Sequence, residues 1–365
     1  AYLIGLSRKL QNPLSGIVIS QAGAGKSGLT ELVELLTPGE DVVLFSRLSS
    51  QALYYMPKDY LKRKLLILEE RVGAEAAEYS IRVLQSRQFL SQAVVVKDPN
   101  TGQMSTRRFE VEGPIAYLET TTSHRINHEN ATRCFELTLD ESEMQTQRIH
   151  QRQRQSRTLE GLMLDFNTDK IQKKHHNAQR LLEQVKIVIP FVDLLSFPSR
   201  WLRTRRDHER FLCLIEAVTF LHQKQRVQKT LASGLVYIEA TLEDYQLAFE
   251  LAQGVLAATF HELSRGAREL LDVAVELQES CKEPGLYSFT RREIRQSLDW
   301  PDRRVQDAVQ ELVDMEYLGV LAGSQGKAFR YRILETPEHG SGLLRNLTTP
   351  AQLAQLLQTS ASFAA

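Results

Sequence analysis

Short apolar runs divide the amino-terminal part of the chain into strand-sized pieces. They cover residues 17–19, 41–45, 64–68, 115–122 and 135–139. Apolar runs of this length are typical of strands that are buried on both faces of a parallel sheet. Segments with helical periodicity stand between some of them, at 29–36 and 74–88. The pattern therefore predicts an α/β fold with a mostly parallel sheet.

The turn after the first run carries the clearest chemistry in the sequence. It reads Ser20-Gln21-Ala22-Gly23-Ala24-Gly25-Lys26-Ser27-Gly28 and lies between a strand and a helix. Glycines let backbone N–H groups turn toward a polyphosphate, and the start of the helix adds partial positive charge. We expect this P-loop to bind ATP, with Lys26 at the β- and γ-phosphates and Ser27 on Mg²⁺. Ser20 stands where the usual pattern has glycine.

Two acids follow the third run, at the end of a buried strand. Ligands of open α/β sheets bind beyond the carboxyl ends of the strands. Glu69 is therefore the expected ligand of Mg²⁺, and Glu70 is expected to polarise the attacking water. The alternative is a strand that ends in a solvated acidic turn. Thr121, at the end of the fourth run, is a candidate to orient the same water, with a register uncertain by one residue and β propensity as the alternative explanation.

The segment 89–111 changes to a strand-like period and contains a turn. Asp98-Pro99-Asn100-Thr101-Gly102 separates the strand-like residues 89–97 and 104–111, which predicts a β-hairpin. Lys97 lies near its tip, and Arg107 and Arg108 lie on the returning strand. These cations are candidates for DNA binding. The alternative is a surface hairpin with solvated charges.

The order of these features resembles one family. A P-loop, an acidic strand, a helix, a hairpin, a polar-tipped strand and Thr132-Arg133-Cys134-Phe135 follow one another. This order resembles the AAA+ core of the minichromosome-maintenance (MCM) helicases and the MCM-like modules of bacterial and phage primase–helicase proteins. The resemblance implies that the hairpin holds DNA in the pore of a ring. It also implies that Arg133 is an arginine finger for the ATP site of a neighbouring subunit, although Cys134 interrupts the family's motif.

The segment 161–262 is expected to form a linker and a helical lid. Arg206, Glu209, Glu216 and Ala217 match the spacing of the family's lid helix. The resemblance implies that Arg206, or else Arg205, is the sensor that touches the γ-phosphate. Without the resemblance, an arginine at a helix start is more often a surface residue. The polar stretch 140–185 is expected to be helical, and its arginines either face solvent or contact DNA or another subunit.

The sequence pattern of residues 263–336 predicts a third domain. Three helical segments (264–278, 291–298 and 303–316) precede two strand-like segments at 318–321 and 328–334. This order is that of a winged helix, in which the third helix and the wing can contact DNA. The candidate contacts are Arg303, Arg304, Lys327, Arg330 and Arg332. The alternative is a winged helix that binds protein or regulates an ATPase ring.

Composition adds limits to this interpretation. Forty-five basic and forty-five acidic residues leave a net charge of zero, so any nucleic-acid contact must come from local patches. The three cysteines are far apart, and no apolar run has the length of a membrane span, which favours a cytoplasmic protein without a membrane partner.

The expected fold is therefore an α/β AAA+ P-loop ATPase core (1–160) with a helical lid (161–262), a C-terminal winged-helix domain (263–336) and a tail (337–365) that is helical at 350–357. The expected function is that of an ATP- and Mg²⁺-dependent DNA helicase or translocase in replication. It would act on single-stranded or forked DNA as a homo-oligomer, expected to be a hexamer, with a fused or recruited primase as a further partner. The alternatives are an AAA+ DNA-binding regulator that does not unwind DNA and, more weakly, a protein remodeller.

Overall fold

The chain forms two compact units, each with its own core. The computed structural model describes residues 1–69, 77–97, 103–122, 128–199, 204–259, 263, 265–281, 287–315, 317–324, 327–334 and 346–363. Unit 1 contains residues 1–255 and 348–365, and unit 2 contains residues 256–347. The chain therefore leaves unit 1 once and returns to it.

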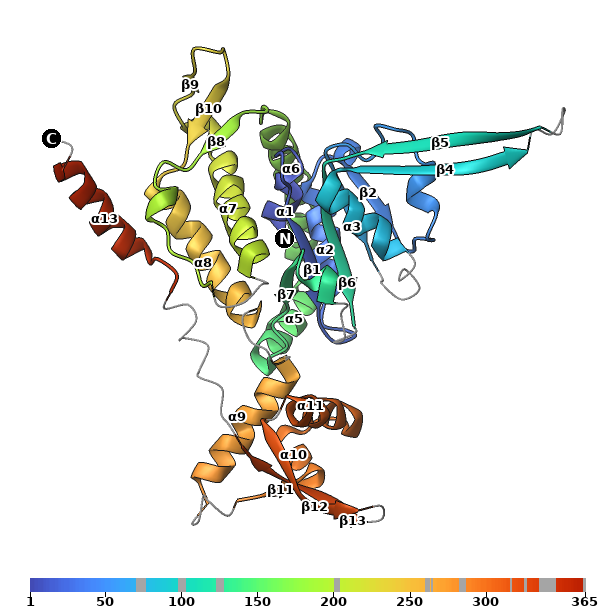
Figure 1. Cartoon of the computed structure of the whole chain (residues 1–365), viewed down its shortest axis with the longest axis vertical. Helices are drawn as coiled ribbons and strands as arrows, with labels where there is room; N and C mark the ends of the chain where they lie inside the picture. Colours follow the sequence, from blue (N-terminus) through green and yellow to red (C-terminus); the bar gives the residue numbers. More distant parts are fainter. Residues whose placement is uncertain are drawn as a thin grey trace. The chain divides into compact units, whose positions relative to one another are not determined.

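A parallel sheet of five strands lies at the centre of unit 1, as in P-loop cores (Figure 1). Its strands, in spatial order, are β2 (Val42–Phe45), β3 (Lys64–Leu68), β6 (Ile115–Thr121), β1 (Ser15–Ile19) and β7 (Phe135–Thr138). All residues of β6 are buried. The expectation of an α/β fold with buried parallel strands is confirmed. Because β6 separates β1 from β3, its carboxyl end lies between the P-loop and the acids that follow β3.

Helices connect and cover these strands. They are α1 (Tyr2–Ser7), α2 (Lys26–Leu36), α3 (Glu78–Arg87), α4 (His128–Ala131), α5 (Glu143–Gln155) and α6 (Leu159–Arg180). The guanidinium of Arg8, which is fully buried, fastens the end of α6 to the sheet by donating to Oδ2 of Asp41 at 2.7 Å and to Oε1 of Gln179 at 2.8 Å.

The predicted hairpin is present and is long. Strands β4 (Phe89–Lys97) and β5 (Met104–Glu112) pair antiparallel from Phe89 opposite Glu112 to Lys97 opposite Met104. Only its base joins the core, through Leu90 and Val111. The rest projects away from the sheet, as Figure 1 shows.

The lid region contains two long helices, α7 (Thr204–Leu221) and α8 (Leu242–Thr259). It also contains a small sheet that the sequence did not predict, with β8 (Lys186–Val188), β10 (Val236–Glu239) and β9 (Lys229–Thr230) in that order. The C-terminal helix α13 (Pro350–Phe363) follows a segment that binds to the lid, because the hydroxyl of Tyr245 donates to the carbonyl of Thr348 at 2.5 Å.

Unit 2 combines three helices with a three-stranded antiparallel sheet. Its elements are α9 (Arg265–Glu279), β11 (Phe289–Thr290), α10 (Arg291–Leu298), α11 (Asp302–Asp314), β12 (Leu318–Ser324) and β13 (Lys327–Ile333), with the strand order β11-β13-β12. Thr290 and Glu293 form a capping box that fixes the start of α10. One apolar core, which includes Leu270, Ile294 and Leu312, holds the helices and strands together.

Among the helices that the structure describes, none is long and apolar enough to span a membrane.

Candidate nucleotide and nucleic-acid sites

The loop between β1 and α2 has the backbone that a phosphate site needs. Gly23 and Gly25 have φ angles of 85° and 98°, which residues with a side chain rarely adopt. Side-chain carbons at Gly23, Gly25 or Gly28 would meet no atom within 4 Å, so these residues border open space. Gly25 caps α2, and the first N–H groups of that helix are therefore available to an anion.

Lys26 points back into its own loop. Its Nζ donates to the carbonyl oxygens of Ser20 at 2.7 Å and Gln21 at 2.6 Å. Burial lowers the pKa of Lys26 below its ordinary value, although the nearby carboxylate of Glu141 acts in the opposite direction. A polyphosphate bound in the loop would replace these two carbonyls as the partner of the ammonium group.

Glu141 is a residue of this loop that the sequence analysis missed. Its Oε1 accepts hydrogen bonds from the hydroxyl of Ser20 at 2.5 Å and from the N–H of Gln21 at 3.0 Å. The serine that departs from the usual P-loop pattern thus has a defined partner just beyond β7. A pairing across 121 positions leaves no local signal in a sequence.

Glu69 lies at the carboxyl end of β3, where the sequence places it. Its Oε2 accepts from the hydroxyl of Ser46, at the end of β2, at 3.0 Å. The hydroxyl of Thr120 donates to its backbone carbonyl. Ser27 is exposed at the first turn of α2. Hydroxyl and carboxylate oxygens suit Mg²⁺, which keeps several waters, so Ser27 and Glu69 fit the predicted ion. The predicted catalytic Glu70 lies outside the described residues.

Thr121 lies beside the P-loop strand. It is buried and stands opposite Ile19, and its carbonyl accepts the N–H of Ser20 at 3.4 Å. On the same strand, the buried carboxyl group of Glu119 accepts the hydroxyl of Tyr117. This acid, which pairs with Leu68 of β3, was not singled out in the sequence.

Arg133 lies at the amino ends of the strands, whereas the P-loop lies at their carboxyl ends. Phe135 pairs with Gly16 and Thr138 pairs with Ile19, so β7 and β1 begin at the same edge. Arg133 precedes that edge, whereas the P-loop follows Ile19. At about 3.3 Å per residue, the two are separated by roughly 10 Å of strand or more.

Arg206 joins Arg133 at that edge and does not reach the P-loop. Its Nη1 donates to the hydroxyl of Thr132 at 2.5 Å. Burial, and then the charge of Arg206, lower the pKa of Arg133. One turn further along α7, Arg210 pairs with buried Asp207, donates to the carbonyl of Cys134 and lies 5.2 Å from the ring centre of Phe135. These contacts fix the start of α7 to β7.

The cations of the hairpin lie on two different faces. Paired residues of antiparallel strands share a face, and successive residues alternate. Arg107 pairs with Val94 on one face, whereas Arg108 and Lys97 belong to the other. Nε of Arg108 forms an ion pair with Oε1 of Glu110 at 2.7 Å. Among the described residues, Lys97 and Arg107 have no ion-pair partner.

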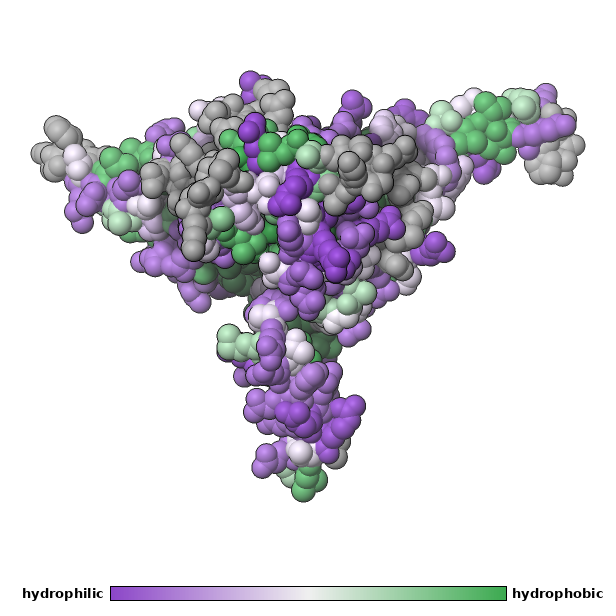
Figure 2. Space-filling model, turned by 90° about the horizontal axis from the view of Figure 1, so that it is seen from below, coloured by the Kyte–Doolittle hydropathy of each residue, from purple (hydrophilic) through white to green (hydrophobic). Residues whose placement is uncertain are grey.

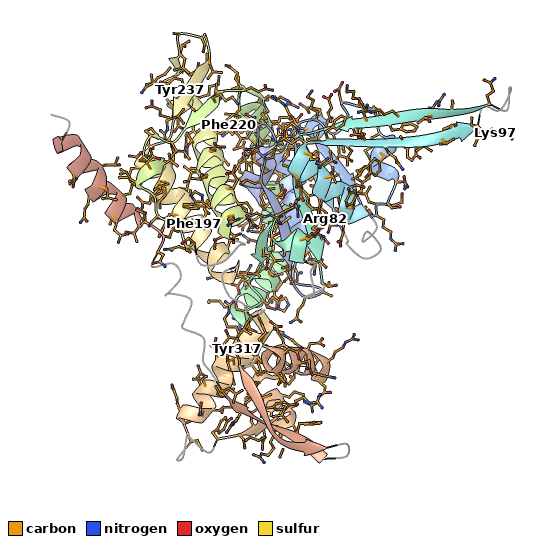
Figure 3. All side chains as sticks on the ribbon, viewed as in Figure 1. Arg82, Lys97, Phe197, Phe220, Tyr237 and Tyr317 are labelled. Atoms are coloured by element: carbon orange, nitrogen blue, oxygen red, sulfur yellow. The ribbon has the colours of Figure 1, made fainter. Side chains whose placement is uncertain are left out.

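Apolar side chains gather on the outer half of the hairpin. Val95 and Met104 are exposed, and Figure 2 shows a green patch near the outer end of this arm. Lys97 lies at the same end, as Figure 3 shows. The outer hairpin therefore offers both positive charge and apolar contact area.

The predicted cations of unit 2 differ in what they contact. Arg304 lies 3.7 Å from the ring centre of Trp300 and pairs with Glu269 at 3.1 Å, so it is held within the unit. Arg330 donates to the hydroxyl and the carbonyl of Ser288. Arg303 and Arg332 are exposed. Lys327 begins β13, opposite Ser324.

Within the described part of the chain, no group of three His, Cys, Asp or Glu side chains is placed to hold a metal ion. No protein-family model matches the sequence, and no curated protein is significantly similar to it. The assignment of a function therefore rests on the geometry of these sites.

Proposed function

We propose that the chain is an ATP-driven, ring-forming DNA helicase or translocase of the MCM-like AAA+ type. Unit 1 would be the AAA+ core with its helical lid, and unit 2 would be a winged-helix domain. ATP and Mg²⁺ are its cofactors, and single-stranded or forked DNA is its substrate. Replication in the cytoplasm, in a hexamer and together with a primase, is the setting that this proposal implies.

The separation of Arg133 from the P-loop carries the proposal. A phosphate bound near Lys26 lies at the carboxyl edge of the sheet, and Arg133 and Arg206 lie at the amino edge. A guanidinium group is worth a large factor in phosphoryl transfer because it stabilises transition-state charge. One copy cannot bring Arg133 to its own phosphates. A second copy can, and repetition of that head-to-tail contact would form a ring when the rotation between copies closes.

The carboxyl edge supplies the remaining chemistry. Lys26 and the metal ion held by Ser27 and Glu69 would neutralise the phosphates. Glu70 would polarise the water, and Thr121, the last residue of β6, would orient it. Positioning and charge stabilisation are most of what such a reaction requires.

ATP hydrolysis and unwinding of a forked duplex test this proposal together. The protein with Mg²⁺ at low salt should do both. Lys26→Ala should abolish both, whereas Lys97→Ala should abolish unwinding and keep ATP hydrolysis. A protein that binds the forked DNA but neither hydrolyses ATP nor unwinds it would disprove the proposed helicase or translocase activity.

A DNA-binding regulator is the second candidate, and unit 2 favours it. Arg303 is exposed on α11, the helix that would enter a major groove in a winged helix. In a regulator, Lys97→Ala should leave DNA binding unchanged and Arg303→Gln should abolish it. In a helicase or translocase, Lys97→Ala should reduce DNA binding more than Arg303→Gln.

A further inference from the structure

Arg133 is held in place by two separate elements. Its Nη1 donates to the carbonyl of Glu129, in α4, at 2.8 Å. Its Nε donates to the hydroxyl of Ser86, in the last turn of α3, at 3.1 Å. Two donors from one planar group, bound to two different elements, fix the direction in which the guanidinium points.

Arg82 fixes the element that holds Arg133. It lies one turn before Ser86 on the same face of α3. Its Nη1 contacts Oε2 of Glu129 at 3.1 Å and donates to Oδ1 of Asn130 at 3.3 Å. Because α4 is only four residues long, it cannot hold its own orientation and depends on such contacts. Figure 3 shows Arg82 on the core of unit 1, far from the outer end of the hairpin.

The surroundings of Arg133 favour an anion. Burial, and then the charges of Arg206 and Arg82, lower the pKa of Arg133, while Glu129 acts in the opposite direction. A pocket of about 340 Å³ opens beside Arg82, Ser86 and Arg133. An excess of guanidinium groups at an open pocket is a site for phosphate oxygens.

Resting on the proposed function, we propose that Arg82 and Ser86 are positioning residues that aim Arg133 at the nucleotide of a second copy. Neither residue has to touch the nucleotide. Arg82 sets α4, α4 and Ser86 set Arg133, and Arg133 meets the terminal phosphate. The helix α3 continues through Gln88 directly into β4. The same helix thus joins the shared ATP site to the base of the hairpin.

Steady-state ATP hydrolysis by substituted full-length proteins tests the positioning role. A misplacement of about 1 Å can cost about a hundredfold, so Arg82→Gln should lower kcat about ten- to a hundredfold, with KM changed less than about twofold. Arg82→Lys should recover part of the loss. Ser86→Ala should lower kcat about fivefold, in line with the loss of one hydrogen bond. The matched control is Arg180→Gln, which breaks the exposed pair with Glu40 and should leave kcat unchanged.

Mixing of two impaired proteins separates positioning from misfolding. Lys26→Ala keeps an intact Arg133 edge, and Arg82→Gln keeps an intact P-loop. A mixture of the two proteins should therefore regain ATP hydrolysis. It should do so at the interfaces where Arg133 of a Lys26→Ala subunit meets the P-loop of an Arg82→Gln subunit. Full activity of both Arg82→Gln and Ser86→Ala would overturn this inference alone. A loss that mixing does not restore would overturn it together with the site shared between two copies. An unsubstituted protein without ATP hydrolysis would overturn the proposed function as well.

Discussion

The hydroxyl of Ser20 and the backbone N–H of Gln21 share one oxygen of Glu141, at 2.5 and 3.0 Å. This carboxylate ties the start of the P-loop to the chain that leaves β7. It also places a negative charge beside the loop that we propose binds the phosphates of ATP. The same side chain therefore orders the loop and opposes its ligand.

Glu141→Gln separates these two effects. Glutamine keeps an oxygen that can accept both hydrogen bonds but removes the charge. We expect ATP to bind about two- to fivefold more tightly, as for the loss of one screened charge repulsion. Titration with a fluorescent ATP analogue measures it. Glu143→Gln is the control, because its carboxylate contacts Gln147 and not the loop. Weaker binding by Glu141→Gln would show that the charge itself stabilises the loop.

The two faces of the hairpin predict separate contacts with DNA. Each phosphate contact on a single strand contributes about 0.7 to the slope of log affinity against log salt. Lys97→Gln and Arg107→Gln should each reduce this slope by about 0.7, and the double substitution by the sum of both. Anisotropy of a labelled oligothymidine across a salt series gives the slopes.

Arg108 provides the matched comparison for this experiment. Its pairing with Glu110 already satisfies its charge, so Arg108→Gln should change the slope less than either of the other substitutions. Glu110→Gln should free Arg108 and make the slope steeper. Equal effects at all three cations would show that Glu110 does not neutralise Arg108.

In unit 2, substitutions of two neighbouring arginines should differ in their effect on stability. Arg304→Gln removes the stacking on Trp300 and the pair with Glu269, and we expect it to lower the free energy of unfolding by about 1 kcal/mol. Arg303→Gln should leave stability unchanged, since Arg303 is exposed. Urea titration followed by tryptophan fluorescence checks both. A stability loss at Arg303 and none at Arg304 would reverse the assignment.

Glu216 predicts a pH-dependent stability of the lid. Burial, and then the charge of Glu209, raise the pKa of Glu216 to about 7, whereas Lys186 lowers it. The neutral acid is therefore favoured in the folded state. Its contribution is fully present below the pKa of the unfolded chain, near 4.5, and is lost as the pH rises through 7.

Glu216→Gln mimics the neutral acid at every pH. We expect it to raise the free energy of unfolding at pH 8 by roughly 2 kcal/mol, and to give little difference at pH 5. Urea unfolding followed by circular dichroism at both pH values measures this change. A variant that is less stable at pH 8 would show that the ionised carboxylate makes a favourable contact.

Much of the fold follows from local patterns in the sequence. The buried strands β1, β3 and β6 are apolar runs of the expected length, and the glycines of the P-loop require φ angles that other residues avoid. The hairpin followed from its turn and flanking strands. The split of Arg107 from Arg108 also follows from strand geometry, because consecutive residues point to opposite faces.

The remaining features depend on contacts between distant parts of the chain. Glu141 binds Ser20 across 121 positions, and Arg210 reaches Cys134 across 76. Pairings between residues so far apart in the sequence change neither its hydrophobic periodicity nor its turn residues. The partners of Arg133 on α3 and α4 were likewise out of reach, because they require the packing of two helices that a hairpin and a strand separate in the sequence.

The return of the chain to unit 1 determines how the two units can be dissected. Thr348 accepts the hydroxyl of Tyr245, and Leu353 is buried. A stop codon after Val255 would therefore remove unit 2 together with the segment that seals the lid. Internal excision of residues 256–347, with a short linker in their place, is the deletion that would report on unit 2 alone.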